Sequence, residues 1–118
     1  MAIITTVSGM WQRFNGENLE LQKRISESVT VTEYGGQKMV LASNITDISI
    51  LPPGLTCVRS LYLETDNKIN VEITGIRTAS FDLYEDGIFV MMNASLSEVK
   101  ISNRSATLTC NPFFDLAG

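Results

Sequence analysis

Apolar and polar residues alternate along much of this chain, in short segments separated by Gly, Pro, Asn and Asp. The clearest case is residues 69–73, where Ile, Val and Ile occupy every second position before Gly75. A period of two places every second side chain on one face of a strand. About eight to ten such segments, with turn signals about every ten residues, predict an all-β fold. We expect a β-sandwich or jelly roll built from antiparallel hairpins, with a small closed barrel as the alternative.

Two-residue turn signals predict hairpins at four places. The signals are Asn15-Gly16, Gly35-Gly36, Asp86-Gly87 and Asn103-Arg104. Gly, Asn and Asp tolerate the positive φ that the tightest hairpin turns require. The first turn would pair Phe14 with Glu17, although residues 19–27 also fit a short helix.

The last two turn signals are supported by the apolar pattern on both sides of them. A single register brings apolar residues onto one face of each predicted ladder, which is stronger evidence than the turn residues alone. The predicted pairs are Phe81 with Met92, Leu83 with Val90, Val99 with Leu108, and Ile101 with Ala106. By the same logic the Gly35-Gly36 turn would pair Val31 with Val40.

The length of 118 residues corresponds to one domain, residues 1–118. Its two ends are candidates for contacts with neighbouring molecules. An N-terminal arm is expected over about residues 1–9, and a C-terminal tail over about residues 111–118, because Pro112 ends the preceding strand pattern. Two adjacent Phe residues in a tail either fold back onto their own core or dock on a neighbour. The predicted assembly interface consists of Ile3, Ile4, Trp11, Phe113, Phe114 and Leu116.

Charge argues against nucleic acid as a partner. The net charge is −4, and Lys23-Arg24 is the only adjacent basic pair. Nucleic-acid-binding domains carry a clustered basic face instead. No apolar run approaches the ~20 residues that span a bilayer, and the first residues lack the pattern of a signal peptide. We therefore expect synthesis in the cytoplasm, no secretion and no membrane partner.

Cytoplasmic synthesis also favours free thiols at Cys57 and Cys110 over a disulfide. Sequons for N-glycosylation occur at Asn44, Asn93 and Asn103, and we interpret all three as turn residues.

The residue types offer little for catalysis, because the chain contains no histidine. Nucleophiles activated by histidine are therefore excluded. The carboxylates near predicted turns, considered as a glycosidase pair or a calcium site, are Glu64, Asp66, Asp82, Glu85 and Asp86. Turn chemistry explains Asp66 and Asp86. We expect no enzyme activity, no catalytic residue, no metal and no cofactor. A sugar-binding platform of Trp11, Tyr34, Tyr62 and Tyr84 is the alternative for the aromatic residues.

The order of strands from residue 28 onward is distinctive. Val58-Arg59-Ser60-Leu61-Tyr62-Leu63-Glu64-Thr65-Asp66 is followed by a strand that closes on Gly75. Phe81-Asp82-Leu83 then leads to a Gly turn, and Val99-Lys100-Ile101-Ser102-Asn103 comes before a last short strand. This order resembles small β-sandwich or jelly-roll virion proteins of tailed bacteriophages, over about three quarters of the chain.

The resemblance implies a structural protein of a phage virion that decorates or cements the capsid surface. The alternative is a tail, neck or baseplate component with a carbohydrate- or receptor-binding role. The expected partners are further copies of the chain, the major capsid protein or other virion proteins. The resemblance transfers no site residue, and residues 1–27 lie outside it.

Overall fold

A computed structural model describes residues 3–118, and in that range the chain forms ten strands and no helix. The strands are β1 (Ile3–Asn15), β2 (Asn18–Val31), β3 (Tyr34–Lys38), β4 (Ile45–Ser49), β5 (Val58–Glu64), β6 (Ile69–Thr74), β7 (Thr78–Leu83), β8 (Ile88–Leu96), β9 (Glu98–Asn103) and β10 (Phe113–Ala117). Every ladder between them is antiparallel.

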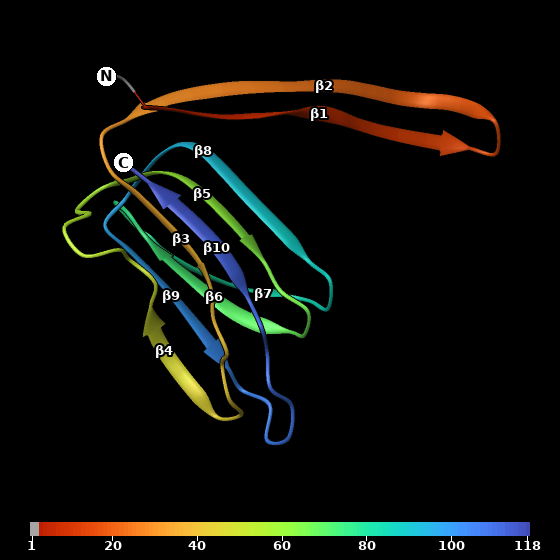
Figure 1. Ribbon diagram of the computed structural model, residues 1–118. Helices are drawn as coiled ribbons and strands as arrows, with labels where there is room; N and C mark the ends of the chain where they lie inside the picture. The colour runs from red at the N-terminus through yellow and green to blue at the C-terminus, as the bar shows by residue number, and fades with distance from the viewer. Residues whose placement is uncertain (1–2) are drawn as a thin grey trace.

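Eight of the strands form two four-stranded sheets that pack face to face, and β1 and β2 form a separate hairpin (Figure 1). The first sheet has the order β3-β10-β5-β8, and the second has the order β4-β9-β6-β7. Apart from the step from β6 to β7, consecutive strands of the sandwich belong to different sheets. This is the double Greek-key connectivity of a jelly roll. The predicted all-β fold is confirmed.

The core lies between the two sheets and follows the predicted alternation. Leu61 and Leu63 of β5, and Ile69 and Val71 of β6, are almost completely buried, at 0–1% exposure. Burying such a side chain stabilises the fold by roughly 1.5–3 kcal/mol. The intervening residues of both strands point to the outer faces of the sandwich.

The first predicted hairpin exists, but its loop is displaced by one residue. The loop residues are Gly16 and Glu17, so Phe14 pairs with Leu19 and not with Glu17. Gly16 has a φ of 62°, which glycine adopts without strain. The strand β2 covers residues 19–27, so the alternative of a helix there is wrong.

The prediction of a turn at Gly35-Gly36 is wrong. Both residues lie inside β3, opposite Leu116 and Asp115 of β10. A Cβ atom on Gly35 would lie 2.7 Å from Cγ of Pro52, and one on Gly36 would lie 2.8 Å from Oδ1 of Asp115. The glycines are therefore explained by close packing and not by turn geometry.

Asp86-Gly87 is a turn, but it joins strands of different sheets. β7 pairs with β6, and β8 pairs with β5, so the predicted ladder from Phe81 to Met92 is wrong. Phe81 and Phe89 instead meet across the sandwich, with ring centroids 4.8 Å apart. An alternating apolar pattern does not distinguish pairing within a sheet from packing between sheets.

The predicted hairpin at Asn103-Arg104 is also wrong. β9 pairs with β4 and β6, and Asn103 is fully buried. Its Nδ2 donates to the carbonyls of Leu41, Ala42 and Leu108 at 2.8–3.1 Å, and its Oδ1 accepts from the backbone N–H of Ser105 at 3.1 Å. The side chain organises a wide loop instead of a two-residue turn.

Residues 111–118 are not a free tail. β10 lies between β3 and β5, and Phe114 and Leu116 point into the core at 3% and 0% exposure. The prediction that these two residues contact a neighbouring molecule is wrong, because their own sandwich buries them. Removing the segment after Asn111 would take away an inner strand and not merely an assembly contact.

Candidate functional site

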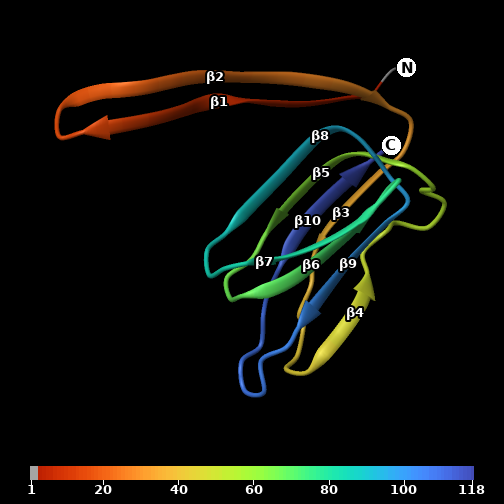
Figure 2. The same ribbon diagram turned by 180° about the vertical axis from the view of Figure 1, so that it is seen from behind.

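The hairpin β1–β2 projects from the sandwich (Figures 1 and 2). β1 has 13 residues, which corresponds to a length of about 43 Å. At its base, Val29 and Val31 are buried against Ile3, Met92 and Ala117. The outer half of the hairpin extends beyond the edge of the sheets. The predicted arm of residues 1–9 is thus one part of a two-stranded element, and residues 1 and 2 lie outside the part of the chain that the structure describes.

The inner face of the hairpin is the face that carries Val29 and Val31. Alternation and register place Trp11, Arg13, Leu21 and Lys23 on this same face, because Trp11 pairs with Lys23 and Arg13 pairs with Leu21. Trp11 is 60% exposed and Leu21 is 40% exposed.

Phe14 and Leu19, which pair beside the turn, add two further exposed apolar side chains at the tip. An isolated two-stranded hairpin is marginally stable in water, and a cluster of exposed apolar residues is typical of an interaction site. The outer half of the hairpin therefore has the properties of a docking element.

The outer face of the first sheet is the second unusual surface. The registers arrange its side chains in three rows across the strands. The row nearest the hairpin contains Ser60 and Ala117, which the base of the hairpin buries. The other two rows contain Asp115, Tyr62 and Val90, and then Phe113, Glu64 and Ile88.

Apolar residues predominate in these two open rows. Ile88 and Val90 are 61% and 40% exposed, and the half-buried rings of Tyr62 and Phe113 pack edge to face with centroids 6.1 Å apart. The Tyr62 hydroxyl donates to Oε2 of Glu64 at 2.8 Å, and this contact raises the pKa of Tyr62. Burial raises the pKa of Asp115. The surface combines aliphatic and aromatic side chains with two carboxylates.

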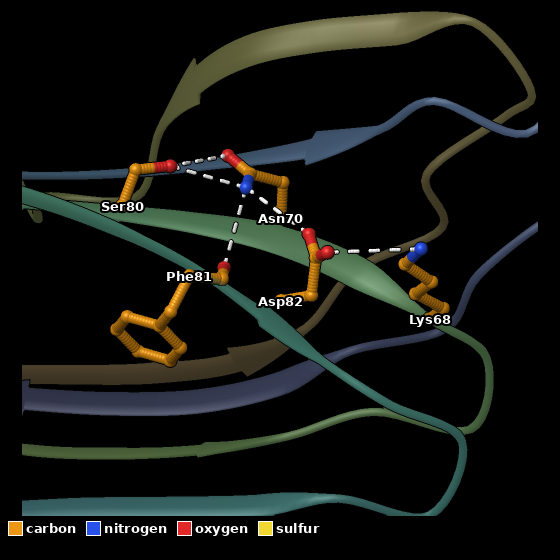
Figure 3. A network of polar contacts seen from close by, with 5 residues as sticks. All are labelled: Lys68, Asn70, Ser80, Phe81 and Asp82. Carbon is orange, nitrogen blue, oxygen red and sulfur yellow. Dashed lines mark hydrogen bonds and ion pairs between the residues drawn. The ribbon is translucent and has the colours of Figure 1, made fainter.

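The outer face of the second sheet has a different character. It is a polar network in which Asn70 contacts Ser80 and Asp82, and Lys68 forms an ion pair with Asp82 at 3.7 Å (Figure 3). Polar side chains of this kind are satisfied by one another and by water. The contrast between the two faces marks the first sheet as the one suited to a partner.

A small, partly open cavity of about 80 Å³ lies between the base of the hairpin and the first sheet. Thr5, Val7, Tyr62, Val90 and Asp115 are among its lining residues. The inner face of the hairpin and the outer face of the sheet thus meet at this cavity, and both surfaces extend away from it.

Three of the predicted carboxylates, Glu64, Asp66 and Asp86, line one hollow of about 320 Å³, whereas Asp82 lies on the outer face of the second sheet. Asp82 contacts Lys68, and Glu64 contacts Tyr62. Asp66 accepts hydrogen bonds from the side chain and backbone N–H of Asn111 at 2.8 and 2.7 Å, which lower its pKa. Within residues 3–118, no group of three Cys, Asp or Glu residues has the arrangement of a metal site.

The predicted interface residues lie in three different environments. Ile4 and Trp11 are exposed on the hairpin, Ile3 is half-buried at its base, and Phe113 is half-buried on the outer face of the first sheet. Phe114 and Leu116 lie in the core. Sequence reasoning missed Leu19, Leu21, Tyr62, Ile88 and Val90 as members of these surfaces. The alternating pattern identified the strands of Tyr62, Ile88 and Val90 but not which of their faces remains uncovered.

The two cysteines are free, with Cys110 buried and Cys57 exposed. Burial raises the pKa of the Cys110 thiol. Of the three sequon asparagines, Asn44 and Asn93 have positive φ values of 59° and 55°, as turn or bulge residues do. Asn103 is buried in the loop contacts described above.

A scan against models of protein families finds no match, and a search of curated proteins finds none. Among solved structures, the cupin domain of Cnp3 from Schizosaccharomyces pombe is similar in fold, with a TM-score of 0.50 and 11% sequence identity. The similarity covers 95% of this chain and 83% of the cupin domain. The cupin fold includes both enzymes and non-enzymes, so the likeness supports the jelly-roll architecture and leaves the activity open.

Proposed function

We propose that this chain is a non-enzymatic structural protein that assembles through its β1–β2 hairpin and the outer face of its first sheet. The observation that carries the proposal is the exposed Trp11 on a hairpin that no other layer covers. Aromatic residues are enriched at interfaces because they combine a large contact area with few rotatable bonds.

The proposed setting is a phage virion, in which the chain decorates or cements the capsid surface. The resemblance in strand order carries this step, and jelly rolls are common among capsid proteins. Its partners would be further copies of the chain together with the major capsid protein or other virion proteins. The core filled by residues such as Leu61 and Val71 leaves the two outer faces and the hairpin as the surfaces for these partners.

Mass spectrometry of purified virions tests the proposed setting. The chain should be present in intact particles in a fixed ratio to the major capsid protein. Its absence from intact particles would rule out the virion role.

A carbohydrate- or receptor-binding role in a tail, neck or baseplate is the second candidate. It is favoured by a hollow of about 400 Å³ lined by Lys68, Asn70 and Asp82, beside which Tyr84 is 64% exposed. Lys68 Nζ lies 5.3 Å from the centre of the Tyr84 ring. Amide, carboxylate and aromatic groups together suit a sugar. A glycan array with the chain in multivalent form should then give hits that Tyr84→Ala removes, and an array without hits would contradict this role.

A further inference from the structure

We propose that the partner of the hairpin is a second copy of this chain, with the inner face of each hairpin packed on the outer face of the other copy's first sheet. The proposal deepens the assembly role proposed above by naming the partner and the two surfaces. It rests on the match between these surfaces in apolar character, in charge and in area.

Both surfaces present apolar side chains that their own chain leaves exposed. The inner face of the hairpin contributes Trp11 and Leu21, whereas the tip pair Phe14 and Leu19 alternates onto the opposite face. The sheet contributes Ile88 and Val90, with the half-buried rings of Tyr62 and Phe113. The outer half of the hairpin extends beyond the sandwich, so its inner face lacks contact with its own sheet in this region (Figures 1 and 2).

In the outer half of the hairpin, the charges on the inner face are opposite in sign to those on the first sheet, and the acidic Glu27 of this face lies nearer the base, opposite Val7. Arg13 and Lys23 lie among the apolar residues of the hairpin's inner face. Asp115 and Glu64 lie among those of the sheet. The basic residue on this side of the sheet, Lys38, lies on the far edge strand β3, away from the hairpin. Opposite charges at the centre of an interface fix its register and exclude wrong partners.

A single copy carries both members of this complementary pair. Two copies related by a two-fold axis would therefore form two identical contacts, as isologous dimers do. Six apolar side chains per copy, each losing on the order of 90 Å², would bury about 540 Å² per copy, and the four charged side chains Arg13, Lys23, Glu64 and Asp115 would add to this area. With these charged side chains the area approaches that of specific interfaces, which bury about 600–1,000 Å² per partner.

The two-fold dimer also explains the position of Asp115. Its carboxylate lies between Gly36 and Tyr62 in the row that continues to Val90, beside the cavity at the base of the hairpin. Such a charge is costly unless a partner pairs with it, and a guanidinium or ammonium group from another copy supplies that partner.

Sedimentation velocity of the full chain over a range of concentrations is the first test. We expect a monomer–dimer equilibrium, and Trp11→Ala should weaken dimerisation at least about tenfold. Ile76→Ala is the matched control, because Ile76 is fully exposed in the loop between β6 and β7. This control should leave dimerisation unchanged. A chain that stays monomeric over the whole range would overturn the proposal.

A charge-exchange experiment tests the pairing itself. Lys23→Glu and Glu64→Lys should each weaken dimerisation, because each variant alone places like charges in both contacts. An equimolar mixture of the two variants should dimerise, because a mixed dimer has opposite charges in both contacts. Circular dichroism confirms that each variant is folded. If the mixture dimerises no better than either variant alone, the proposed contact between the hairpin of one copy and the first sheet of the other is contradicted.

These outcomes are separable from those of the proposed virion role. A chain that is monomeric but still present in virions would overturn the proposed dimer and leave the virion role intact. The partner of the hairpin would then be another virion protein. A chain that forms the dimer but is absent from virions would rule out the virion role and leave the proposed dimer intact.

Discussion

At the scale of single residues, Asn103 shows how one side chain replaces a turn. Its amide satisfies three backbone carbonyls that the loop after β9 would otherwise leave without partners. The sequence offers the same Asn that a tight turn would use, and it gives no sign that this residue is buried. The choice between the two roles is made by the strands β4 and β6 on either side of β9.

Replacing Asn103 by Ala should lower the free energy of unfolding by about 2–4 kcal/mol, because it leaves buried carbonyls unsatisfied. Urea denaturation followed by circular dichroism measures the change. Asn93→Gly is the control, since Asn93 is exposed with a φ of 55° that glycine adopts readily. A loss of less than about 1 kcal/mol for Asn103→Ala would show that the amide is dispensable.

Asp66 should make stability depend on pH. Hydrogen bonds from Asn111 lower its pKa in the folded state. The stability from this group is therefore present above the pKa of the unfolded chain and is lost as the pH falls through the lower, folded-state pKa.

Asp66→Asn should remove this contribution, which amounts to less than about 1 kcal/mol because the group is solvent-screened. Urea denaturation at neutral and acidic pH, with Glu85→Gln as an exposed control, measures it. An equal loss of stability with falling pH in the wild type and in Asp66→Asn would contradict this role for Asp66.

At the scale of elements, the sequence predicted most strands but not their partners. The alternation in residues 69–73 identified β6. The turn at Asp86-Gly87 suggested a hairpin because Phe81 and Leu83 match the apolar residues that follow it. In a jelly roll these strands belong to different sheets, so contacts across the core decide the topology.

The C-terminal strand is a second case in which the sequence did not predict the pairing partners. Phe113-Phe114 looked like an exposed pair because a proline precedes it and few residues follow it. The neighbouring strands β3 and β5 each supply five paired residues to β10, and these long-range ladders are not visible in a local pattern.

Truncation after Asn111 should prevent the sandwich from folding, because it removes an inner strand with the buried residues Phe114 and Leu116. We expect a far-UV circular dichroism spectrum without a cooperative thermal transition. A truncated chain that unfolds cooperatively near the transition of the full chain would contradict the position of β10.

Shortening the hairpin should have the opposite result. Residues 9–25 can be replaced by an Asn-Gly turn that joins the paired residues Ser8 and Ser26. The sandwich should fold with little change in its thermal transition, because the buried residues Val29 and Val31 remain in place. Loss of the cooperative transition would show that the outer half of the hairpin is needed for folding.

At the scale of the whole molecule, the two outer faces of the sandwich account for its proposed behaviour. The polar network on the second sheet suits contact with water, and the apolar rows on the first sheet suit a partner. The single tryptophan of the chain lies on the hairpin that would cover those rows in another copy. The composition does not show which outer face is polar and which is apolar, because the strands of both sheets have a similar alternating pattern.

Asp115 connects stability with assembly at this scale. Burial raises its pKa, so its charged form destabilises the single copy at neutral pH. That penalty is absent at low pH and appears as the pH rises through the raised pKa. Asp115→Asn should therefore stabilise the monomer at neutral pH and also weaken dimerisation. Chemical denaturation and sedimentation measure the two effects, and a variant that dimerises more tightly than the wild type would contradict the paired role of this carboxylate.

Fluorescence of Trp11 tests the central claim most directly, because every tryptophan signal comes from the hairpin. In a single copy the indole is 60% exposed. As the protein concentration rises through the dimerisation range, its emission should shift to shorter wavelength and its quenching by acrylamide should decrease. Emission and quenching that stay those of an exposed indole, at concentrations where copies associate, would show that association does not involve the hairpin.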